Sequence, residues 1–333
     1  MIRWAALAAL LLLAACVDAD PPVMPHDIVT PALTKHAFVM DDGAPLPYRA
    51  WLPDRKPRAI ILAVHGINDY SNGFRHPAEA WVKDGIATYA YDQRGFGEAP
   101  LRGRWVGAWQ LDSDLAEASR VLRAKYPGVP LYLLGESMGG AVVITAMAGS
   151  TGAPKPVADG VILSAPAVWG RVTMNVFERV ALWSGNELFP ALTLSGRGLN
   201  ITPSDNEEAL RELSRDPLVI KETRIDTIKG LVDLMDLALE AAPKLEGTPM
   251  LLLYGQHDEI MPASPIRAFI AALGKREDGE SRIALYEHGY HLLLRDLDAK
   301  LVVHDIATWI GDHRAALPSG ADRRARDGLA ARG

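Results

Sequence analysis

The chain alternates short apolar runs with longer segments in which apolar residues recur at helical spacing. Six runs have the length of β-strands and lie at 59–66, 87–95, 130–135, 160–166, 249–255 and 282–289. A strand with one face in water alternates apolar and polar residues, whereas these runs are apolar throughout. They therefore predict strands that helices bury on both faces.

Helical periodicity fills the intervals between these runs. It is found at 113–126, 138–149, 264–273 and 296–313. Asp112 or Ser113 is expected to cap the N-terminus of the first of these helices. Further upstream, Asp41-Asp42-Gly43 separates two short strand-like runs and predicts a hairpin turn. Strands that alternate with helices predict an α/β domain with a mostly parallel sheet over residues 35–315.

Two segments break this alternation. Residues 169–242 contain helix-like stretches and no convincing strand, and they are too numerous for an ordinary loop. We expect a small helical cap, whose apolar residues either pack against the core or line an apolar pocket for an acyl chain. Residues 316–333 lack a hydrophobic period and are expected to be disordered.

The first residues have the pattern of an export signal. Arg3 precedes an apolar stretch from Trp4 to Ala15 that is too short to span a bilayer comfortably. The four residues 13–16, Leu-Ala-Ala-Cys, resemble the lipobox of bacterial lipoproteins, in which cleavage leaves a lipid-modified cysteine as the new N-terminus. We interpret 1–15 as a signal peptide and 16–34 as an extended tether. The alternative is a plain signal peptide with an incidental cysteine.

Cys16 is the only cysteine, which excludes an intramolecular disulfide and a cysteine-based zinc site. Its lipidation would anchor the domain to a membrane of the bacterial cell envelope without a spanning helix. Val17 follows Cys16, at the position where an aspartate would signal retention in the inner membrane. The valine therefore favours the periplasmic side of the outer membrane.

The composition narrows the class of protein. Of the 333 residues, 49% are hydrophobic and 23% are charged, which is typical of a globular protein with a sizeable core. The net charge of -6 offers no basic surface for nucleic acid, so we expect no nucleic-acid partner.

One serine stands between an apolar strand run and an apolar helix run. It lies in Gly135-Glu136-Ser137-Met138-Gly139, a G-x-S-x-G string. Between a strand and a helix, this string marks a nucleophile elbow, where the hydroxyl stands clear at the end of the sheet and above the N-terminus of the next helix. Ser137 is therefore the candidate nucleophile, and the alternative is a turn with an idle serine.

A serine hydroxyl needs a base to take its proton and a carboxylate to orient that base. In such a fold the acid and then the histidine follow the serine along the chain. Asp258 lies just beyond the run 249–255, and His291 comes directly before an apolar helix start. We take them as the candidate acid and base, with His288 and His257 as alternative titrating groups. Because no third ligand cluster accompanies His288 and His291, we expect no metal, and no cofactor is implied.

Two backbone N–H groups are candidates for binding the oxyanion that forms during acyl transfer. One belongs to Met138, directly after the nucleophile. The other belongs to Ile67, in the loop after the run 59–66, where Gly66 lets the backbone turn. His65 is expected to be a structural hydrogen-bonding residue rather than a catalyst.

Several motifs resemble those of the monoacylglycerol lipase and lysophospholipase branch of the serine α/β-hydrolases, a serine aminopeptidase S33-like group. They are HGIND (65–69), YDQRGFGEA (91–99), GESMGG (135–140), LLLYGQHDEIMP (251–262) and GYHLLLRD (289–296), with SDNEEALRELSRDPLV (204–219) resembling that branch's cap. The resemblance runs from about residue 38 to 310. It implies an α/β-hydrolase fold with a helical cap, and it assigns Ser137, Asp258 and His291 to the triad and Ile67 and Met138 to the oxyanion hole.

The chain departs from that branch in residues that border the site. Asn68-Asp69-Tyr70 stands where the branch often has Gly-Glu-His, and Gly95-Phe96-Gly97 stands where it usually has Gly-His-Gly. Glu136 replaces the commoner histidine before the nucleophile. These changes leave the triad whole and leave the substrate open.

The resemblance implies a serine hydrolase that cleaves carboxylic esters of acyl lipids, of the monoacylglycerol or lysophospholipid type, through an acyl-enzyme. An acyltransferase would use the same triad. A serine aminopeptidase would need a cap carboxylate for the substrate amine, and Glu178, Glu187 or Glu207 is a candidate. A non-catalytic lipid-binding protein of the envelope is the remaining alternative.

Overall fold

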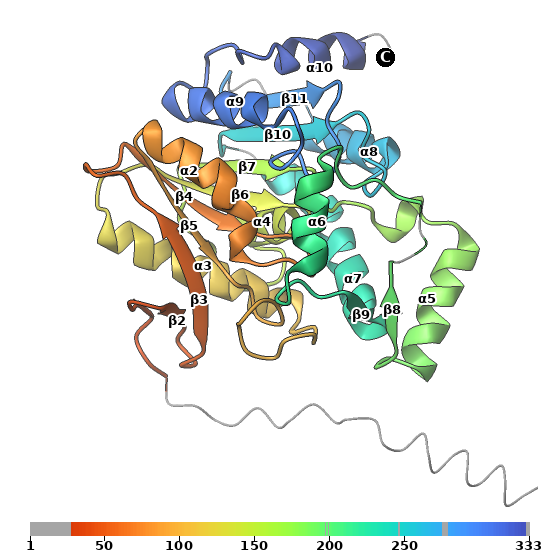
Figure 1. Cartoon of the computed structure of the whole chain (residues 1–333). Coiled ribbons are helices and arrows are strands. Elements are labelled where there is room, and N and C mark those ends of the chain that lie inside the picture. The colour runs from red at the N-terminus through yellow and green to blue at the C-terminus, as the bar shows by residue number, and fades with distance from the viewer. Residues whose placement is uncertain (1–27, 197, 199, 246, 275–278, 331–333) are drawn as a thin grey trace, which may run out of the picture.

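A large twisted sheet lies at the centre of the molecule (Figure 1). The computed structural model describes residues 28–330 except 197, 199, 246 and 275–278. Over these residues the order of strands in the sheet is β1-β2-β3-β5-β4-β6-β7-β10-β11. The strands are β1 (Ala32–Leu33), β2 (Ala37–Val39), β3 (Pro45–Trp51), β4 (Ala59–Val64), β5 (Ile86–Tyr91), β6 (Leu131–Glu136), β7 (Gly160–Ser164), β10 (Met250–Gly255) and β11 (Arg282–Tyr286).

The predicted α/β class is confirmed. From β5 through β4, β6, β7 and β10 to β11 all neighbours pair in parallel, and only β1, β2 and β3 are antiparallel. Each predicted buried run contains a strand, and the run usually extends a few residues past it into the loop at the carboxyl end. The expected hairpin at Asp41-Asp42-Gly43 joins β2 to β3, with Val39 opposite Pro45.

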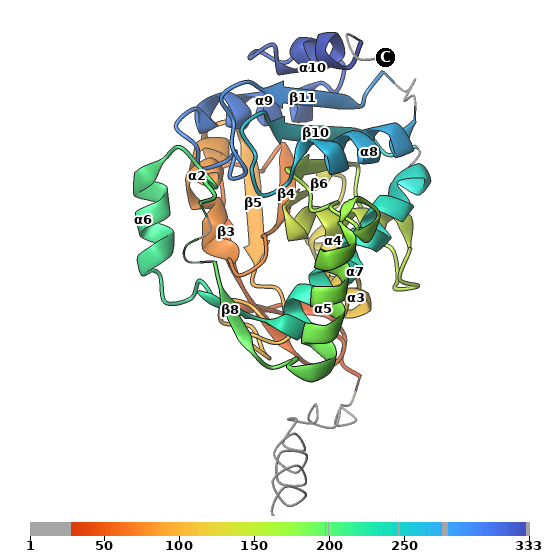
Figure 2. The ribbon, with the colours of Figure 1, turned by 90° about the vertical axis from the view of Figure 1, so that its right-hand side faces the viewer.

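Helices cover both faces of the sheet, as Figures 1 and 2 show. They are α2 (Arg75–Lys83), α3 (Ala108–Lys125), α4 (Met138–Ala148), α5 (Val176–Leu188), α6 (Glu207–Arg215), α7 (Ile225–Ala241), α8 (Ala263–Leu273), α9 (Ala299–Gly311) and α10 (Ala321–Ala330). Alternate residues of β4 enter different clusters: Ile60, Leu62 and Val64 pack with α3, α4 and α7, whereas Ile61 and Ala63 pack with α2 and α9. This two-sided burial explains why the strand runs are apolar throughout.

The expected N-cap of the first long helix was wrong. Helix α3 begins at Ala108, before Asp112 and Ser113, and its N-cap position is Gly107 without a side-chain cap. Asp112 is instead fully buried inside the helix, where its carboxylate accepts hydrogen bonds from Thr145 Oγ1 at 2.8 Å and Thr151 Oγ1 at 2.7 Å. A residue type that favours caps thus serves here to join α3 to α4 and the turn after it.

The insertion between β7 and β10 is a cap that is not wholly helical. It contains α5, α6 and α7, and also β8 (Thr193–Ser195) and β9 (Glu222–Arg224), which pair antiparallel. In Figures 1 and 2, α5 and α6 stand apart from each other. Helix α7 belongs to the core through Val232, Leu234 and Met235. The strands β8 and β9 are only three residues each, which is too short for a recognisable period.

Both chain ends of the domain are more ordered than expected. Residues 316–333 were expected to be disordered, but α10 packs beside β11 (Figure 1). Leu317, Ala321 and Ala325 lie at helical spacing and are at least 97% buried, so small alanines supply a stripe that hydropathy hardly reveals. At the other end, β1 pairs with β2 before residue 35, inside the expected tether. The expected signal peptide, Cys16 and residues 17–27 lie outside the described residues, as do 331–333.

No helix among the described residues is both long enough and apolar enough to cross a bilayer.

The buried carboxyl of Asp112 predicts a pH-dependent stability. Burial raises the pKa of Asp112 to about 7, against the opposing effect of its two threonine hydrogen bonds. The folded state therefore holds a proton that the unfolded state releases from about pH 4 upward, so stability should fall as pH rises towards 7. Asp112→Asn removes this loss and retains a partner for both threonines. We expect the variant to gain stability over wild type as pH rises from 4 to 8, by at most about 4 kcal/mol.

Thermal unfolding of both proteins at pH 5 and pH 8 measures this gain. Comparing the two proteins at each pH cancels the contributions of all other titrating groups. A difference between them that does not change with pH would contradict the prediction.

Candidate active site

Ser137 occupies a strained turn between β6 and α4. Its backbone has φ 53° and ψ -118°, in the left-handed region that residues with a side chain rarely adopt. Hydrogen bonds hold the turn on both sides: Ser137 N–H donates to Ser164 O at 3.0 Å, and Ser137 O accepts from Gly140 at 2.9 Å and from Ala167 at 2.9 Å. The predicted strand–turn–helix context of the G-x-S-x-G string is therefore present, with the serine at its tip.

The neighbouring glycines allow backbones to approach closely around this turn. A Cβ added to Gly135 would overlap the backbone of Gly139. One added to Gly139 would overlap the Val64 carbonyl and lie 2.8 Å from the His65 carbonyl oxygen. These glycines thus let the start of α4 pack directly against the end of β4.

Asp258 and His291 meet at the same edge of the sheet. Asp258 follows β10 and His291 follows β11, and His291 Nδ1 lies 2.8 Å from Asp258 Oδ2. The other carboxylate oxygen, Oδ1, accepts from the N–H groups of Ile260 at 2.9 Å and Met261 at 2.8 Å. Since the carboxylate accepts, Nδ1 carries the proton and Nε2 is left as the basic nitrogen. Both side chains are more than 90% buried.

The structure separates His291 from the alternative histidines. His288 and His257 are exposed, and the His257 ring stacks on Tyr290 with centroids 5.3 Å apart. Ser137, Asp258 and His291 follow β6, β10 and β11, so all three lie at the carboxyl ends of parallel strands. Among the described residues no hydrogen bond joins Ser137 Oγ to His291, and in ligand-free sites such bonds are often long.

The loop after β4 runs beside the nucleophile. A Cβ added to Gly66 would lie 3.2 Å from Ser137 Cβ and 3.8 Å from Ser137 Oγ. Ile67 follows at once, and Met138 is the first residue of α4, where N–H groups have no partner within the helix. The residues of the two expected oxyanion donors thus come next to the Ser137 side chain, Met138 along the chain and Ile67 through its neighbour Gly66.

His65 makes hydrogen bonds that hold this loop, as expected of a structural residue. Its Nε2 accepts the N–H of Gln93 at 3.0 Å, while Gln93 Nε2 donates to His65 O at 2.7 Å. The proton therefore sits on Nδ1, which lies 2.8 Å from Gly66 O. Burial lowers the pKa of His65, which keeps the ring neutral.

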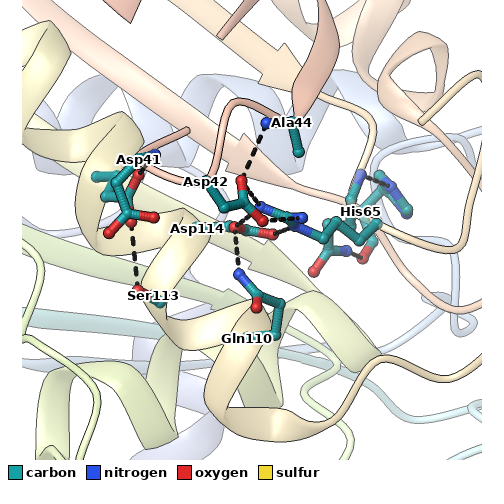
Figure 3. A network of polar contacts seen from close by, with 10 residues as sticks. Asp41, Asp42, Ala44, His65, Gln110, Ser113 and Asp114 are labelled. Carbon is teal, nitrogen blue, oxygen red and sulfur yellow. Dashed lines mark hydrogen bonds and ion pairs between the residues drawn. The ribbon is translucent and has the colours of Figure 1, made fainter. Parts of the chain in front are cut away.

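A largely buried ion cluster, which includes Asp42 and Asp114, lies near His65 (Figure 3). Arg94 donates to Asp42 at 2.6 and 2.8 Å and to Asp114 at 2.8 and 3.0 Å. The turn after β5 is therefore joined to the β2–β3 hairpin and to α3. Through Gln93 and His65, these contacts extend to the loop that carries Ile67.

The cap contacts two of the loops that carry candidate site residues. Asn68 Nδ2 donates to Thr223 Oγ1 at 2.7 Å, and Asn68 O accepts from Ile220 at 2.9 Å. On the other side, Leu292 N–H donates to Pro203 O at 2.9 Å, directly after His291. The cap is thus placed over the site by its segments at 203 and 220–223.

Helix α5 meets the packing expectation only in part. Leu182 packs against the core, but none of the described residues of α5 is fully buried. Phe177 is 82% exposed, Trp183 66% and Leu188 67%. Trp169 and Met174, which precede the helix, do pack on the core.

Sequence reasoning did not find Arg295. This buried guanidinium forms ion pairs with Asp69 and, at 3.3 Å, with Glu136. Asp69 and Glu136 had been noted only as departures from a family pattern. The sequence does place a charged residue within four positions of each of Ile67, Ser137 and His291, and this could have indicated a charged group near the site.

A cavity of about 470 Å³ lies behind the loop after β4, between α2, α6 and α9. Asp69, Tyr70 and Arg295 line it, together with apolar residues such as Leu213 and Val303. Its described lining does not include Ser137, Asp258 or His291, so it is not the place where an ester would meet the nucleophile. No group of three or more His, Cys, Asp or Glu side chains in the described part of the chain is arranged to hold a metal ion.

Comparison with known sequences gives a family and several relatives. The model of the family described as serine aminopeptidase, S33 matches residues 55–298. A monoacylglycerol lipase of Mycolicibacterium smegmatis is 26% identical over 302 residues, covering 86% of this chain and 100% of the relative. The human monoglyceride lipase is 27% identical over 284 residues, covering 84% and 90%.

Solved structures share the fold. The crystal structure of Paleococcus ferrophilus monoacylglycerol lipase superposes with a TM-score of 0.63 and 24% identity, covering 80% of this chain and 99% of that one. A soluble variant of the Saccharomyces cerevisiae monoglyceride lipase, in complex with a substrate analog, gives 0.67 and 21%, covering 90% and 100%. At this identity the likeness establishes the fold.

The close contact at Gly139 predicts that Gly139→Ala is destabilising. The added Cβ would meet the Val64 carbonyl, so α4 would have to move away from β4 and carry Ser137 with it. We expect a loss of about 1–3 kcal/mol in the free energy of unfolding, measured by urea denaturation, and slower labelling of Ser137 by a fluorophosphonate.

Gly196→Ala is the matched control, because a Cβ there meets nothing within 4 Å. Its stability and labelling should equal those of wild type. Normal labelling of Gly139→Ala would mean that the approach of α4 to β4 does not set the position of the serine.

Proposed function

Since the chain belongs to the serine aminopeptidase S33 family, we propose that it hydrolyses carboxylic esters of acyl lipids through an acyl-enzyme intermediate. The observation that carries the proposal is the strained Ser137 turn at the same sheet edge as the Asp258–His291 pair. The substrates are of the monoacylglycerol or lysophospholipid type, the class that the names of its monoacylglycerol lipase relatives indicate.

The geometry supports the following steps. Ser137 Oγ attacks the ester carbonyl while His291 Nε2 takes its proton, and Asp258 holds the ring in the tautomer that leaves Nε2 free. The N–H groups of Ile67 and Met138 donate to the oxyanion. His291 then returns the proton to the leaving alcohol. Water, activated by the same nitrogen, releases the fatty acid and restores Ser137.

An acyl ester fits this cap better than a peptide does. A peptide amine would need a carboxylate facing the site, but Glu178, Glu187 and Glu207 are all exposed. Glu178 accepts from the Asn175 backbone as part of a helix cap, and Glu207 pairs with Arg211. The apolar side chains exposed on α5 suit an enzyme that works close to lipid.

We further propose that the enzyme is anchored through a lipid on Cys16 to a membrane of the bacterial cell envelope, with the periplasmic side of the outer membrane favoured. The lipobox-like residues 13–16 support this anchor. Residues 17–27 would reach at most about 40 Å when extended, which keeps the domain near the bilayer surface.

The nucleophile assignment predicts the behaviour of Ser137→Ala. A fluorophosphonate should label wild type and should not label the variant, and hydrolysis of a monoacylglycerol should fall about 10⁴-fold or more. Ser150→Ala, at the far end of α4, is the control and should keep both activities. Equal labelling of Ser137→Ala and wild type would exclude this mechanism. A panel of acyl chain lengths, with an aminoacyl amide as the peptide-like arm, defines the substrate class.

The anchor predicts covalent acylation at Cys16. Cells grown with labelled palmitate should yield labelled wild-type protein, and Cys16→Ser should carry no label. Ser137→Ala separates the anchor from an acyl-enzyme, because it should be labelled as fully as wild type. Loss of the label in Ser137→Ala with retention in Cys16→Ser would contradict the anchor.

A further inference from the structure

Arg295 is a buried cation that contacts two buried carboxylates. It is 8% exposed, Asp69 is 8% exposed and Glu136 is 1% exposed. One terminal nitrogen of the guanidinium donates to Asp69 Oδ2 and, at 3.3 Å, to Glu136 Oε1. The three charges therefore form one connected group inside the domain.

Each member of this group belongs to a different catalytic loop. Glu136 directly precedes Ser137 at the end of β6. Asp69 follows Ile67 by two residues in the loop after β4, and Arg295 follows His291 by four in the segment after β11. The guanidinium thus contacts, or is part of, the three segments that carry the nucleophile, an oxyanion donor and the base.

We propose that Arg295 is a positioning residue that fixes the relative places of Ser137, Ile67 and His291. The proposal rests on the proposed function, since it concerns the same reacting groups. It also gives a role to Glu136, which is to hold the nucleophile turn to the segment that carries the base.

We call the contacts of Arg295 with Asp69 and Glu136 the bridge. Further hydrogen bonds hold Asp69 and the backbone of Arg295 in place. Asp69 Oδ1 accepts the N–H of Tyr70 at 2.9 Å, so both oxygens of this carboxylate are engaged. Arg295 N–H donates to Leu292 O at 2.7 Å, and Arg295 O accepts from Asn206 Nδ2 at 2.8 Å. These contacts fix the Asp69 carboxylate and the backbone of Arg295, the two ends between which the guanidinium lies.

The packing around the bridge is adapted to the guanidinium. A Cβ added to Gly73 would overlap the Arg295 terminal nitrogen and lie 2.8 Å from Asp69 Oδ2. The turn at 71–74 therefore closes over the Asp69–Arg295 pair only because it has a glycine there. The guanidinium stays charged when buried, and one of its terminal nitrogens lies within reach of both carboxylates.

Stability alone does not account for this group. Removing three charges from water costs more than well-packed apolar residues would, and such triads are often replaced without loss of stability. Within the described chain, Arg295 Nε and Glu136 Oε2 are buried without a hydrogen-bond partner. Burial raises the pKa of Glu136, and Arg295 opposes that rise. The three residues therefore carry a desolvation cost that apolar packing would avoid. Such a cost is expected where the residues serve to fix the relative positions of loops rather than to add stability.

The decisive variant is the double substitution Asp69→Asn with Arg295→Met. It leaves no charge at Asp69, and Glu136, whose pKa is raised by burial against the opposing effect of Arg295, should bind a proton once Arg295 is gone. No buried charge is then left unpaired, so the protein should fold. We expect kcat for a soluble short-chain ester to fall about 10- to 100-fold, with KM within about twofold of wild type and the fluorophosphonate labelling rate reduced in parallel. A folded double variant with the kcat of wild type would overturn the proposal. So would a change confined to KM.

Arg295→Lys keeps the charge and covers the case in which the double variant does not fold. The shorter lysine side chain should pair with Asp69 but fall short of Glu136, whose contact with Arg295 is already long at 3.3 Å, so its kcat should lie between those of wild type and the double variant. In this background, Glu136→Gln should have less effect on kcat than it has alone. Equal, independent effects, or a wild-type kcat in Arg295→Lys, would overturn the bridge.

Arg123→Met with Asp159→Asn is the matched control. This ion pair, with 2.6 Å between its nitrogen and oxygen, lies just before β7, at the opposite edge of the sheet from Ser137. The same exchange of side chains there should leave kcat unchanged. The proposed function is tested separately by wild type: if it neither reacts with the fluorophosphonate nor hydrolyses esters, that function fails, whatever the variants do.

Discussion

The backbone contact between the start of α4 and the end of β4 is the constraint on which the site depends. Gly139 lies against the Val64 carbonyl, and this contact leaves no room for any side chain at that position. The turn at Ser137 is therefore held in a conformation that a serine would not adopt by itself, with φ 53°. The strain is maintained because β4, which is fully buried, and α4, which is almost fully buried, cannot move apart without exposing the core.

Polar contacts then place the remaining groups relative to that turn. His65 and Gln93 hold the loop that carries Ile67. Arg94, the residue after Gln93, pairs with Asp42 of the β2–β3 hairpin and with Asp114 of α3. Asp258 is held by the N–H groups of Ile260 and Met261, so it approaches His291 from a fixed direction. Buried charges are costly, and this domain uses them mainly at the carboxyl ends of its strands, where the loops lack the apolar packing that orders strands.

Sequence was sufficient for the parts of the fold that repeat a simple pattern. Six apolar runs predicted six strands, because burial on both faces leaves a continuous apolar signal. The elbow at Ser137 and the pairing of Asp258 with His291 followed from position at strand ends, although their catalytic roles stay predictions. The start of α3, the strands β8 and β9, and the helix α10 were missed. Each depends on tertiary contacts: a buried Asp112, a pair of three-residue strands, and alanines against β11.

Arg295 shows why the site could be predicted only in part. The local sequence does not indicate that Arg295 will contact Asp69 and Glu136. These contacts depend on the sheet order β4-β6-β7-β10-β11, which brings the ends of distant strands together. Cap segments at 203 and 220–223 make hydrogen bonds to two of these loops. Helix α5 belongs to the same cap, and most of its apolar side chains are exposed. The cap is therefore joined, through backbone hydrogen bonds at Asn68 and Leu292, to the loops that carry a candidate oxyanion donor and the candidate base.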